Sequence, residues 1–222
     1  MTIKEPSVAS GRIGSDESGK GDYFGPLVVA AVFVNPEIEQ DLVLMQVRDS
    51  KRISDGRILE LAPDIRQLCK HNIVAIGPQR YNELYNKIRN LNRLLAWGHA
   101  RALENLLEQV NCELAIADQF GDERFILNAL LEKGKRIRLV QRPKAEEDLA
   151  VAAASILARA EFLTRLKRLS DEVGTSLPKG ASPSVELAAR MVLKKHGRER
   201  LNTIAKMHFK TTLAVLATPP EA

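Results

Sequence analysis

The sequence predicts an α/β fold in which a mixed central sheet is flanked by helices on both faces and followed by C-terminal helices. Two strand-like segments come first, and shorter strand-like segments then alternate with helical ones, the pattern expected of such a sheet. The composition supports a packed protein, because 45% of the 222 residues are hydrophobic and 27% are charged. This length suffices for one sizeable domain or two small ones.

Residues 12–18 and 27–34 are expected to be strands, and the glycine turn between them predicts a hairpin. A helix over 54–68 is indicated by apolar residues at helical spacing. A second helix begins at Asn90, and Gly98 on its apolar face predicts close packing against a neighbour. The other expected elements are strands at 72–76, 113–117 and 136–140 and helices at 123–133, 147–170, 184–196 and 199–206.

The domain organisation is expected to be simple, because no repeat and no Gly-, Pro- or Ser-rich linker interrupts the chain. We expect one catalytic domain over residues 12–216, with loose tails at 1–11 and 217–222. Cys69 and Cys112 are too few for a disulfide framework and lack metal-ligand spacing, so they are expected to be reduced core residues. With neither a transmembrane stretch nor a signal pattern, the protein is predicted to be cytoplasmic and without membrane contact. We also expect it to be a monomer.

The most informative segment is Gly14–Gly25, in which two adjacent carboxylates precede a glycine turn. Asp16 and Glu17 come just before Gly19-Lys20-Gly21. Acidic side chains beside such a turn have little use in folding, but they suit a place where a divalent metal ion meets a phosphodiester. Carboxylates bind the metal, and a turn with few side chains lets backbone N–H groups approach a polyanion.

The same segment also contains the beginning of a P-loop pattern, Gly14-x-x-x-x-Gly19-Lys20. Position 21 is glycine, where the P-loop needs Ser or Thr to bind magnesium. The two carboxylates would also repel the nucleotide phosphates that such a loop encloses. The P-loop interpretation is therefore disfavoured.

Further carboxylates stand at the ends of predicted elements. Asp118 follows the strand at 113–117, and Glu146 precedes the long helix. If the strands that carry Asp16 and Asp118 are neighbours, the two carboxylates face each other across a short gap. Each could instead have a local role, Asp118 as a helix N-cap or turn residue and Glu146 as favourable charge at a helix N-terminus. Glu17 raises a further question, because adjacent strand residues point to opposite faces. Either the strand is irregular, or Glu17 reaches round.

The charge distribution favours a polyanionic partner without establishing one. The net charge is +5, and a mild excess of this kind also occurs in proteins that bind nothing acidic. The positive charges are clustered, as a phosphate-binding face requires, although solvated helix ends give the same pattern. The clusters lie at Lys133–Arg138, Arg142–Lys144, Lys194–Arg200 and Lys206–Lys210.

The segment Ile13–Pro26 resembles the first motif of the type 2 ribonucleases H, and more closely that of the ribonuclease HIII branch. Further matches follow in the family's order and extend the resemblance over about residues 12–215. They are Asp49–Lys51, Asn90–Ala96 with His99, Ala117–Phe120, Lys144–Glu146 leading into Val151–Arg159, Leu177–Ser182 and Met207–Phe209.

This resemblance implies a ribonuclease H-like fold and hydrolysis of the RNA strand of RNA–DNA hybrids, leaving 5′-phosphate and 3′-hydroxyl ends. It implies that Asp16, Glu17, Asp118 and Glu146 are catalytic and bind two Mg²⁺ or Mn²⁺ ions, which in such sites lie about 3.5–4 Å apart. Asp16 would bridge both ions. Asp118 and Glu17 would hold the ion at the leaving group, and Glu146 would help to hold the ion that activates water.

The expected nucleic-acid-binding residues come from the same motifs. The backbone of the glycine turn would approach the 2′-hydroxyl that distinguishes RNA from DNA. A tyrosine ring could stack on a sugar or base, and lysines would support charge at phosphates. A histidine could shuttle a proton or contact a phosphate, or be purely structural. The full set is Gly19, Lys20, Gly21, Tyr23, Lys51, Lys144, Ser155, Lys179 and His208.

Two positions favour the HIII branch. HII proteins typically have Asp at the position of Glu146, and a junction-reading Tyr at the position of Ala181. HIII proteins usually carry an additional N-terminal substrate-binding domain, whereas only about a dozen residues precede the first motif here; we therefore expect weaker hybrid binding. Two alternatives stay open. One is a junction nuclease of the HII type that excises single ribonucleotides from DNA, and the other is a non-catalytic nucleic-acid-binding domain.

Overall fold

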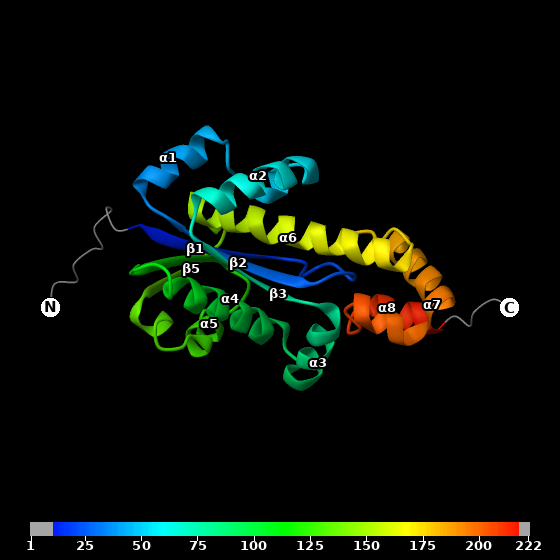
Figure 1. The fold of residues 1–222 in the computed structure, drawn as a ribbon. Coiled ribbons are helices and arrows are strands. Elements are labelled where there is room, and N and C mark those ends of the chain that lie inside the picture. Colours follow the sequence, from blue (N-terminus) through cyan, green and yellow to red (C-terminus); the bar gives the residue numbers. More distant parts are fainter. Residues whose placement is uncertain (1–10, 218–222) are drawn as a thin grey trace. The chain divides into compact units, whose positions relative to one another are not determined.

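The computed structural model describes residues 11–217, and its five strands form one sheet in the order β3-β2-β1-β4-β5 (Figure 1). The strands are β1 (Arg12–Ser18), β2 (Leu27–Val34), β3 (His71–Ile76), β4 (Leu114–Asp118) and β5 (Arg138–Arg142). Strand β4 runs parallel to both β1 and β5. The helices are α1 (Pro36–Leu44), α2 (Asp55–Leu68), α3 (Pro78–Ile88), α4 (Leu91–Leu107), α5 (Arg124–Ala129), α6 (Leu149–Val173), α7 (Pro183–Ile204) and α8 (Lys210–Ala217), with 3-10 turns η2 (Ser50–Arg52), η3 (Gly134–Arg136) and η4 (Ala145–Glu147).

The predicted fold class, a mixed sheet flanked by helices, is confirmed. Strands β1 and β2 have the expected bounds and are neighbours in the sheet. The two helices expected at 184–196 and 199–206 correspond to α7, which is interrupted at Gly197, where φ is 78°. Helices α1, α3 and α8 were not predicted.

The helix expected at 123–133 is wrong beyond residue 129. The chain leaves helical geometry because the buried carboxylate of Glu104 accepts the backbone N–H groups of Leu131 (2.7 Å) and Gly134 (2.8 Å). These bonds favour a turn over a helix. The strand expected at 136–140 consequently begins two residues later, at Arg138.

The described chain divides into two compact units. The first contains the described residues up to Glu17, together with Val29–Val74 and Asn92–Ala160. The second contains Ser18–Val28, Ala75–Leu91 and the described residues from Glu161 onward. Whether residues 12–216 act as one catalytic domain stays a prediction. Apart from Gly11 and Ala217, the predicted tails lie outside the described residues.

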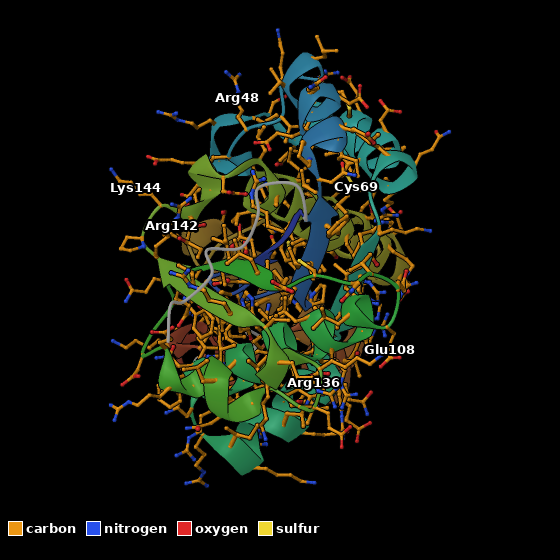
Figure 2. All side chains as sticks on the ribbon, turned by 90° about the vertical axis from the view of Figure 1, so that its left-hand side faces the viewer. Arg48, Cys69, Glu108, Arg136, Arg142 and Lys144 are labelled. Carbon is orange, nitrogen blue, oxygen red and sulfur yellow. The ribbon has the colours of Figure 1, made fainter. Side chains whose placement is uncertain are left out.

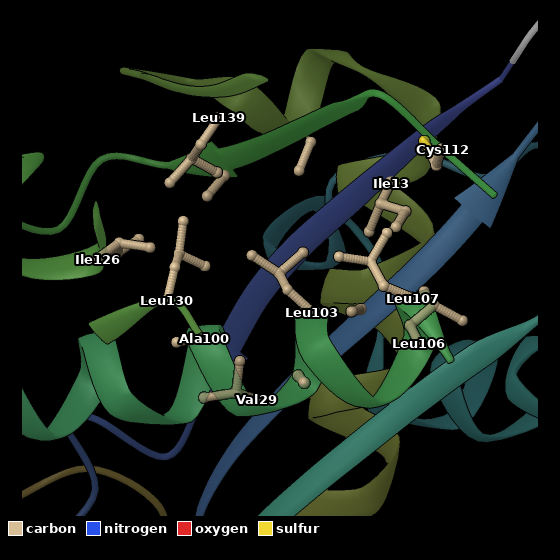
Figure 3. Close-up of a cluster of buried hydrophobic side chains, with 14 of the residues drawn as sticks. Ile13, Val29, Ala100, Leu103, Leu106, Leu107, Cys112, Ile126, Leu130 and Leu139 are labelled. Carbon is tan, nitrogen blue, oxygen red and sulfur yellow. The ribbon is translucent and has the colours of Figure 1, made fainter. Parts of the chain in front are cut away.

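In the first unit, α4 and α6 cover opposite faces of the sheet (Figure 1). On the α4 face, side chains such as Ile13, Val29 and Leu103 form the core (Figure 3). A Cβ atom at Gly98 would lie 2.8 Å from Val29 Cγ2, which confirms the predicted close packing of α4. On the opposite face, a Cβ atom at Gly14 would lie 2.1 Å from the backbone of Ala150, so β1 and α6 meet almost without intervening side chains.

In the second unit, α3, α7 and α8 pack together. The buried side chain of Asn82 donates to the carbonyl of Ala205 (2.9 Å) and accepts from the N–H of Met207 (2.9 Å). This connection fixes the segment that follows α7.

Both cysteines, Cys69 and Cys112, are free and buried, as predicted. None of the helices in residues 11–217 is both long and apolar enough to cross a membrane.

Candidate active site

Asp16 and Asp118 occupy adjacent positions on one face of the sheet. Ser15 pairs with Ala117 in the parallel register of β1 and β4, so Asp16 and Asp118 are the next positions along the two strands. Strand alternation places both on the face of Gly14, toward α6. The two strands are neighbours, which is the condition under which the sequence predicted that these carboxylates face each other.

Asp16 is buried, although an aspartate side chain in water is ionised at neutral pH. Its side chain is 8% exposed, and its Oδ1 accepts the backbone N–H of Glu17 at 2.8 Å. Burial and the neighbouring charge of Glu17 raise the pKa of Asp16 well above its ordinary value, with a smaller contribution from Asp118. Burial also raises the pKa of Asp118, although the N–H of Ala145 donates to its Oδ1 at 3.2 Å. Negative charge at this sheet edge is thus incompletely compensated.

Glu17 points to the opposite face, because β1 continues regularly to Ser18. Its Oε2 lies 3.2 Å from Nε2 of His99 on α4. The Nδ1 atom of the same ring lies 2.7 Å from Oγ of Ser15, and the ring is stacked on Phe120 with centroids 4.9 Å apart. All three polar groups are satisfied when Ser15 donates to Nδ1 and the Nε2–H donates to Glu17. His99 therefore fixes the orientation of Glu17, on the sheet face opposite to that of Asp16 and Asp118. The strand is regular here, and whether Glu17 reaches round to a metal stays a prediction.

Glu146 lies in η4, directly after β5, and contacts Lys51 of η2. Nζ of Lys51 is 3.3 Å from Oε1 of Glu146. Burial opposes ionisation of Glu146, but its own backbone N–H and the Lys51 ammonium lower its pKa below the ordinary value. The other carboxylate oxygen, Oε2, is buried and has no hydrogen-bond partner among the described residues. One oxygen of Glu146 is thus available to a ligand.

The position of η2 depends on α6. Arg159 donates to the carbonyl of Ser50 at 2.8 Å, and Ser155 is hydrogen-bonded to the Ser50 hydroxyl. Asp49 accepts the backbone N–H of Lys51 at 2.9 Å. The predicted nucleic-acid contact of Ser155 is not supported, because its side chain is buried and bonded within the protein, where its hydroxyl also lowers the pKa of Asp16.

The carboxylates suit a divalent cation but do not form a closed cage around one. Among residues 11–217, no group of three or more His, Cys, Asp and Glu side chains is arranged to hold a metal ion. The donor set nevertheless fits Mg²⁺ or Mn²⁺, which prefer oxygen ligands. A bound cation would give the unpartnered Oε2 of Glu146 a partner and would offset the burial that raises the pKa values of Asp16 and Asp118.

The glycine turn, in the second unit, uses its two glycines differently. Gly19 has a φ of +87°, and a Cβ atom there would lie 2.1 Å from the carbonyl oxygen of Pro26, so glycine is required for the turn itself. Gly21 is exposed, and nothing lies within 4 Å of the position its Cβ atom would take. The backbone around Gly21 is therefore accessible to a ligand. Lys20, between them, is half-buried.

Tyr23 does not present its ring to solvent, contrary to the predicted stacking on a sugar or base. It is 0% exposed, and its hydroxyl accepts a hydrogen bond from Thr212 at 3.1 Å. The ring packs edge-on against Phe24, with centroids 4.9 Å apart. Lys206 also departs from expectation, because this member of a predicted basic cluster is buried.

Three other predicted nucleic-acid-binding residues are accessible. Lys179 and His208 are exposed in the second unit, and Lys144 is exposed in the first, where its side chain projects away from the ribbon (Figure 2). The ring of His208 stacks on Tyr85, with centroids 4.0 Å apart. Burial, followed by the charge of Lys206, lowers the pKa of His208, which favours the neutral ring.

Several residues that organise these sites have roles that no local sequence pattern indicates. His99 belonged to a recognised motif, which was a usable signal, but its contact with Glu17 spans 82 residues. Arg159 likewise stood in a motif without a role. No local pattern indicated that Asp22 accepts the N–H of Gly180, 158 residues away, at 2.6 Å.

Comparison with known proteins identifies the family. The family model described as ribonuclease HII matches residues 13–212. The chain belongs to the ribonuclease HII family. It is 50% identical to ribonuclease HIII of Protochlamydia amoebophila over 204 residues, which are 92% of this chain and 68% of that protein. It is 47% identical to ribonuclease HIII of Chlamydia pneumoniae, over 90% of this chain and 68% of that protein.

Solved structures agree with this assignment. The structure of Bst-RNase HIII in complex with Mn²⁺ matches with a TM-score of 0.88 and 36% identity, covering 95% of this chain and 71% of that one. RNase HII from Archaeoglobus fulgidus, solved with PCNA, matches with a TM-score of 0.75 and 28% identity, covering 94% of this chain and 98% of that one. The predicted resemblance to ribonuclease HIII is confirmed, and the chain is a hydrolase of the ribonuclease H class.

Proposed function

We propose that this protein is a metal-dependent endoribonuclease that hydrolyses the RNA strand of RNA–DNA hybrids and leaves 5′-phosphate and 3′-hydroxyl ends. The observation that carries the proposal is the pair Asp16 and Asp118, adjacent in register on one sheet face beside Glu146. Clustered carboxylates of this kind would weaken a protein that only binds nucleic acid, because they repel phosphates. They have a clear use in phosphodiester hydrolysis.

The four acids would hold two Mg²⁺ or Mn²⁺ ions, with Asp16 shared between them, Asp118 and Glu17 at one ion and Glu146 at the other. Such ions lower the pKa of water and stabilise charge on the attacking and leaving oxygens. The protein's part is to hold the carboxylates in place and oriented. The N–H groups of Glu17 and Ala145 donate to Asp16 and Asp118, respectively, and His99 orients Glu17.

Lys51 balances part of the negative charge. Its ammonium lies 3.3 Å from Glu146, and its side chain is 67% exposed, so it can exchange this contact for a substrate phosphate. Lys144, Lys179 and the backbone at Gly21 are accessible and would contact the hybrid. The RNA strand would be recognised by its 2′-hydroxyl near the glycine turn. Cytoplasmic location and a monomeric state remain predictions.

The proposal is tested by incubating the protein and Mg²⁺ or Mn²⁺ with an end-labelled RNA–DNA hybrid. Cleavage of the RNA strand alone, with 5′-phosphate products, is expected. Asp118→Asn should be inactive, whereas Asp64→Asn, an equal charge change on the exposed side of α2, should cleave normally. An intact RNA strand in both metals would refute the proposed activity.

A duplex with a single ribonucleotide separates the two type 2 activities. Ala181, in the exposed loop after Gly180, offers no aromatic ring to read an RNA–DNA junction. We therefore expect poor incision at a single ribonucleotide and efficient cleavage within a run of ribonucleotides. Equal or better incision at the single ribonucleotide would assign the junction activity instead.

A further inference from the structure

Lys206 places an ammonium group inside the second unit. Its side chain is fully buried. Nζ donates to the backbone carbonyls of Asp22 (2.7 Å) and Gly25 (2.8 Å), and lies 5.7 Å from the centre of the Tyr81 ring. The charge is therefore bound by main-chain dipoles of one short segment.

An ammonium group is an expensive choice for this position. Removing it from water is unfavourable, and well-packed apolar residues commonly replace buried charges without loss of stability. Burial lowers the pKa of Lys206 to about 7, which is the expected consequence of that penalty. An apolar side chain would fill this space at lower cost. The presence of a lysine is better explained by the carbonyl groups that it binds.

The segment bound by Lys206 is hydrogen-bonded to two loops that were predicted to contact nucleic acid. On one side, the N–H of Asp22 closes the glycine turn on the carbonyl of Gly19 at 3.4 Å. On the other side, Oδ1 of Asp22 accepts the N–H of Gly180 at 2.6 Å, and the N–H of Tyr23 donates to the carbonyl of Gly180 at 2.9 Å. Gly180 directly follows the exposed Lys179.

The backbone around Lys206 reinforces the same segment. Its own N–H donates to the carbonyl of Tyr23 at 2.8 Å, and the N–H of Gly25 donates to the carbonyl of Ile204 at 2.9 Å. The side chain and main chain of one residue thus hold consecutive peptide groups. This arrangement fixes the orientation of the segment that follows the glycine turn and to which the Lys179 loop is hydrogen-bonded.

We propose that Lys206 is a positioning residue for substrate binding, whose ammonium holds the carbonyls of Asp22 and Gly25 so that the glycine turn and the Lys179 loop present one surface to the backbone of the hybrid. The inference rests on the proposed function. It adds a residue that touches no substrate and acts through the loops. Because these loops would contact substrate and transition state alike, their misplacement should weaken binding more than chemistry.

The test uses Lys206→Met, which keeps the length of the side chain and removes the ammonium. Lys87→Met, an equal charge change on the exposed side of α3, is the matched control. Kinetics are measured well below the unfolding midpoint of each variant. Lys206→Met is expected to raise KM for the hybrid about tenfold and to change kcat less than about threefold, whereas Lys87→Met should match the wild type.

Amide hydrogen exchange supplies a readout that does not depend on catalysis. In Lys206→Met, the N–H groups of Tyr23 and Gly180 should exchange at least about tenfold faster, while amides within α7 keep their wild-type rates. Asp22→Ala removes the acceptor of the Gly180 N–H from a half-buried position and should also raise KM. This second variant decides the matter if Lys206→Met does not fold.

The outcomes separate the inference from the function on which it rests. Unchanged KM and unchanged exchange at Tyr23 and Gly180 would overturn the positioning role. A lower unfolding midpoint with wild-type KM would show that Lys206 is merely structural, which also overturns it. A wild-type protein that leaves the hybrid intact would refute the proposed function, and the exchange rates would still decide whether Lys206 holds the two loops.

Discussion

Replacing Asp16 with asparagine is expected to abolish hybrid cleavage and at the same time to stabilise the metal-free protein at neutral pH. The substitution fits the site, because an amide oxygen can still accept the backbone N–H that Glu17 donates at 2.8 Å. The amide nitrogen can donate to the neighbouring carboxylates. What changes is the charge, which the structure leaves poorly compensated.

The effect on stability follows from the direction of the pKa shift. The pKa of Asp16 is raised in the folded state by burial and by the charge of Glu17. The folded protein thus binds this proton more tightly than the unfolded chain does, and stability falls as the pH rises through that window. Each unit of difference costs about 1.4 kcal/mol at pH values above the folded-state pKa. Asn removes this penalty, so its advantage in stability over the wild type should be small at about pH 4 and should grow as the pH rises toward 7.

The effect on activity has the opposite sign. Carboxylate-bound metal contributes several kcal/mol to such reactions, and each 1.36 kcal/mol is a factor of ten in rate. Hybrid cleavage by Asp16→Asn should therefore fall at least about 10³-fold. Adding Mg²⁺ should stabilise the wild type, because a ligand of the folded state raises stability by mass action, and should leave the variant unchanged.

The assay is urea unfolding in EDTA at pH 4 and pH 7, followed by hybrid cleavage in Mg²⁺. Asp64→Asn provides the control for loss of one negative charge on the surface of the same unit. A variant that is less stable than the wild type at pH 7 would contradict the penalty for the buried charge of Asp16. A variant that retains near-normal turnover would exclude Asp16 as a metal ligand.

Three further outcomes are expected. Gly14→Ala should lower the free energy of unfolding by about 1–3 kcal/mol or more, since its Cβ atom would lie 2.1 Å from the backbone of Ala150. A change below about 0.5 kcal/mol in urea unfolding would contradict this packing. His99→Ala should reduce kcat about 10–100-fold with little change in KM, because Glu17 loses its partner; steady-state kinetics that match the wild type would exclude this role. The pKa of Lys206 is lowered to about 7 in the folded protein. The free energy of unfolding of the wild type, relative to that of Lys206→Met, should therefore increase between about pH 7 and 10.4. A difference between the two proteins that does not change with pH would contradict the burial of this amino group.

Local pattern and chain order were sufficient to predict the central part of the fold. The apolar run at β2 and the motif at β1 gave both strands their correct bounds, because each is long enough to show its burial pattern. The adjacency of Asp16 and Asp118 was expected only if their strands were neighbours, and the register of β1 and β4 meets that condition. Small Gly98 on an apolar helix face correctly indicated the contact with Val29.

The remaining features depend on partners that are distant in the sequence. The end of α5 is set by Glu104, some 27 residues before the N–H group that it accepts at Leu131. Lys206 resembles a surface lysine in composition, and only its carbonyl partners 181–184 residues away explain its burial. Tyr23 is likewise buried, and its hydroxyl accepts a hydrogen bond from Thr212, 189 residues away. Burial of a polar residue is decided by such long-range contacts, which a single sequence does not display.

The central claim is that the carboxylates around Asp16 and Asp118 bind the metal ions that make hydrolysis possible. Its most direct test is a Mn²⁺ titration in which the free ion is followed by electron paramagnetic resonance, with wild type, Asp118→Asn and Asp64→Asn compared. Wild type and Asp64→Asn are expected to bind Mn²⁺ alike, and Asp118→Asn is expected to bind it at least about tenfold more weakly. Equal affinity in all three proteins would place the metal elsewhere and exclude Asp118 as a ligand.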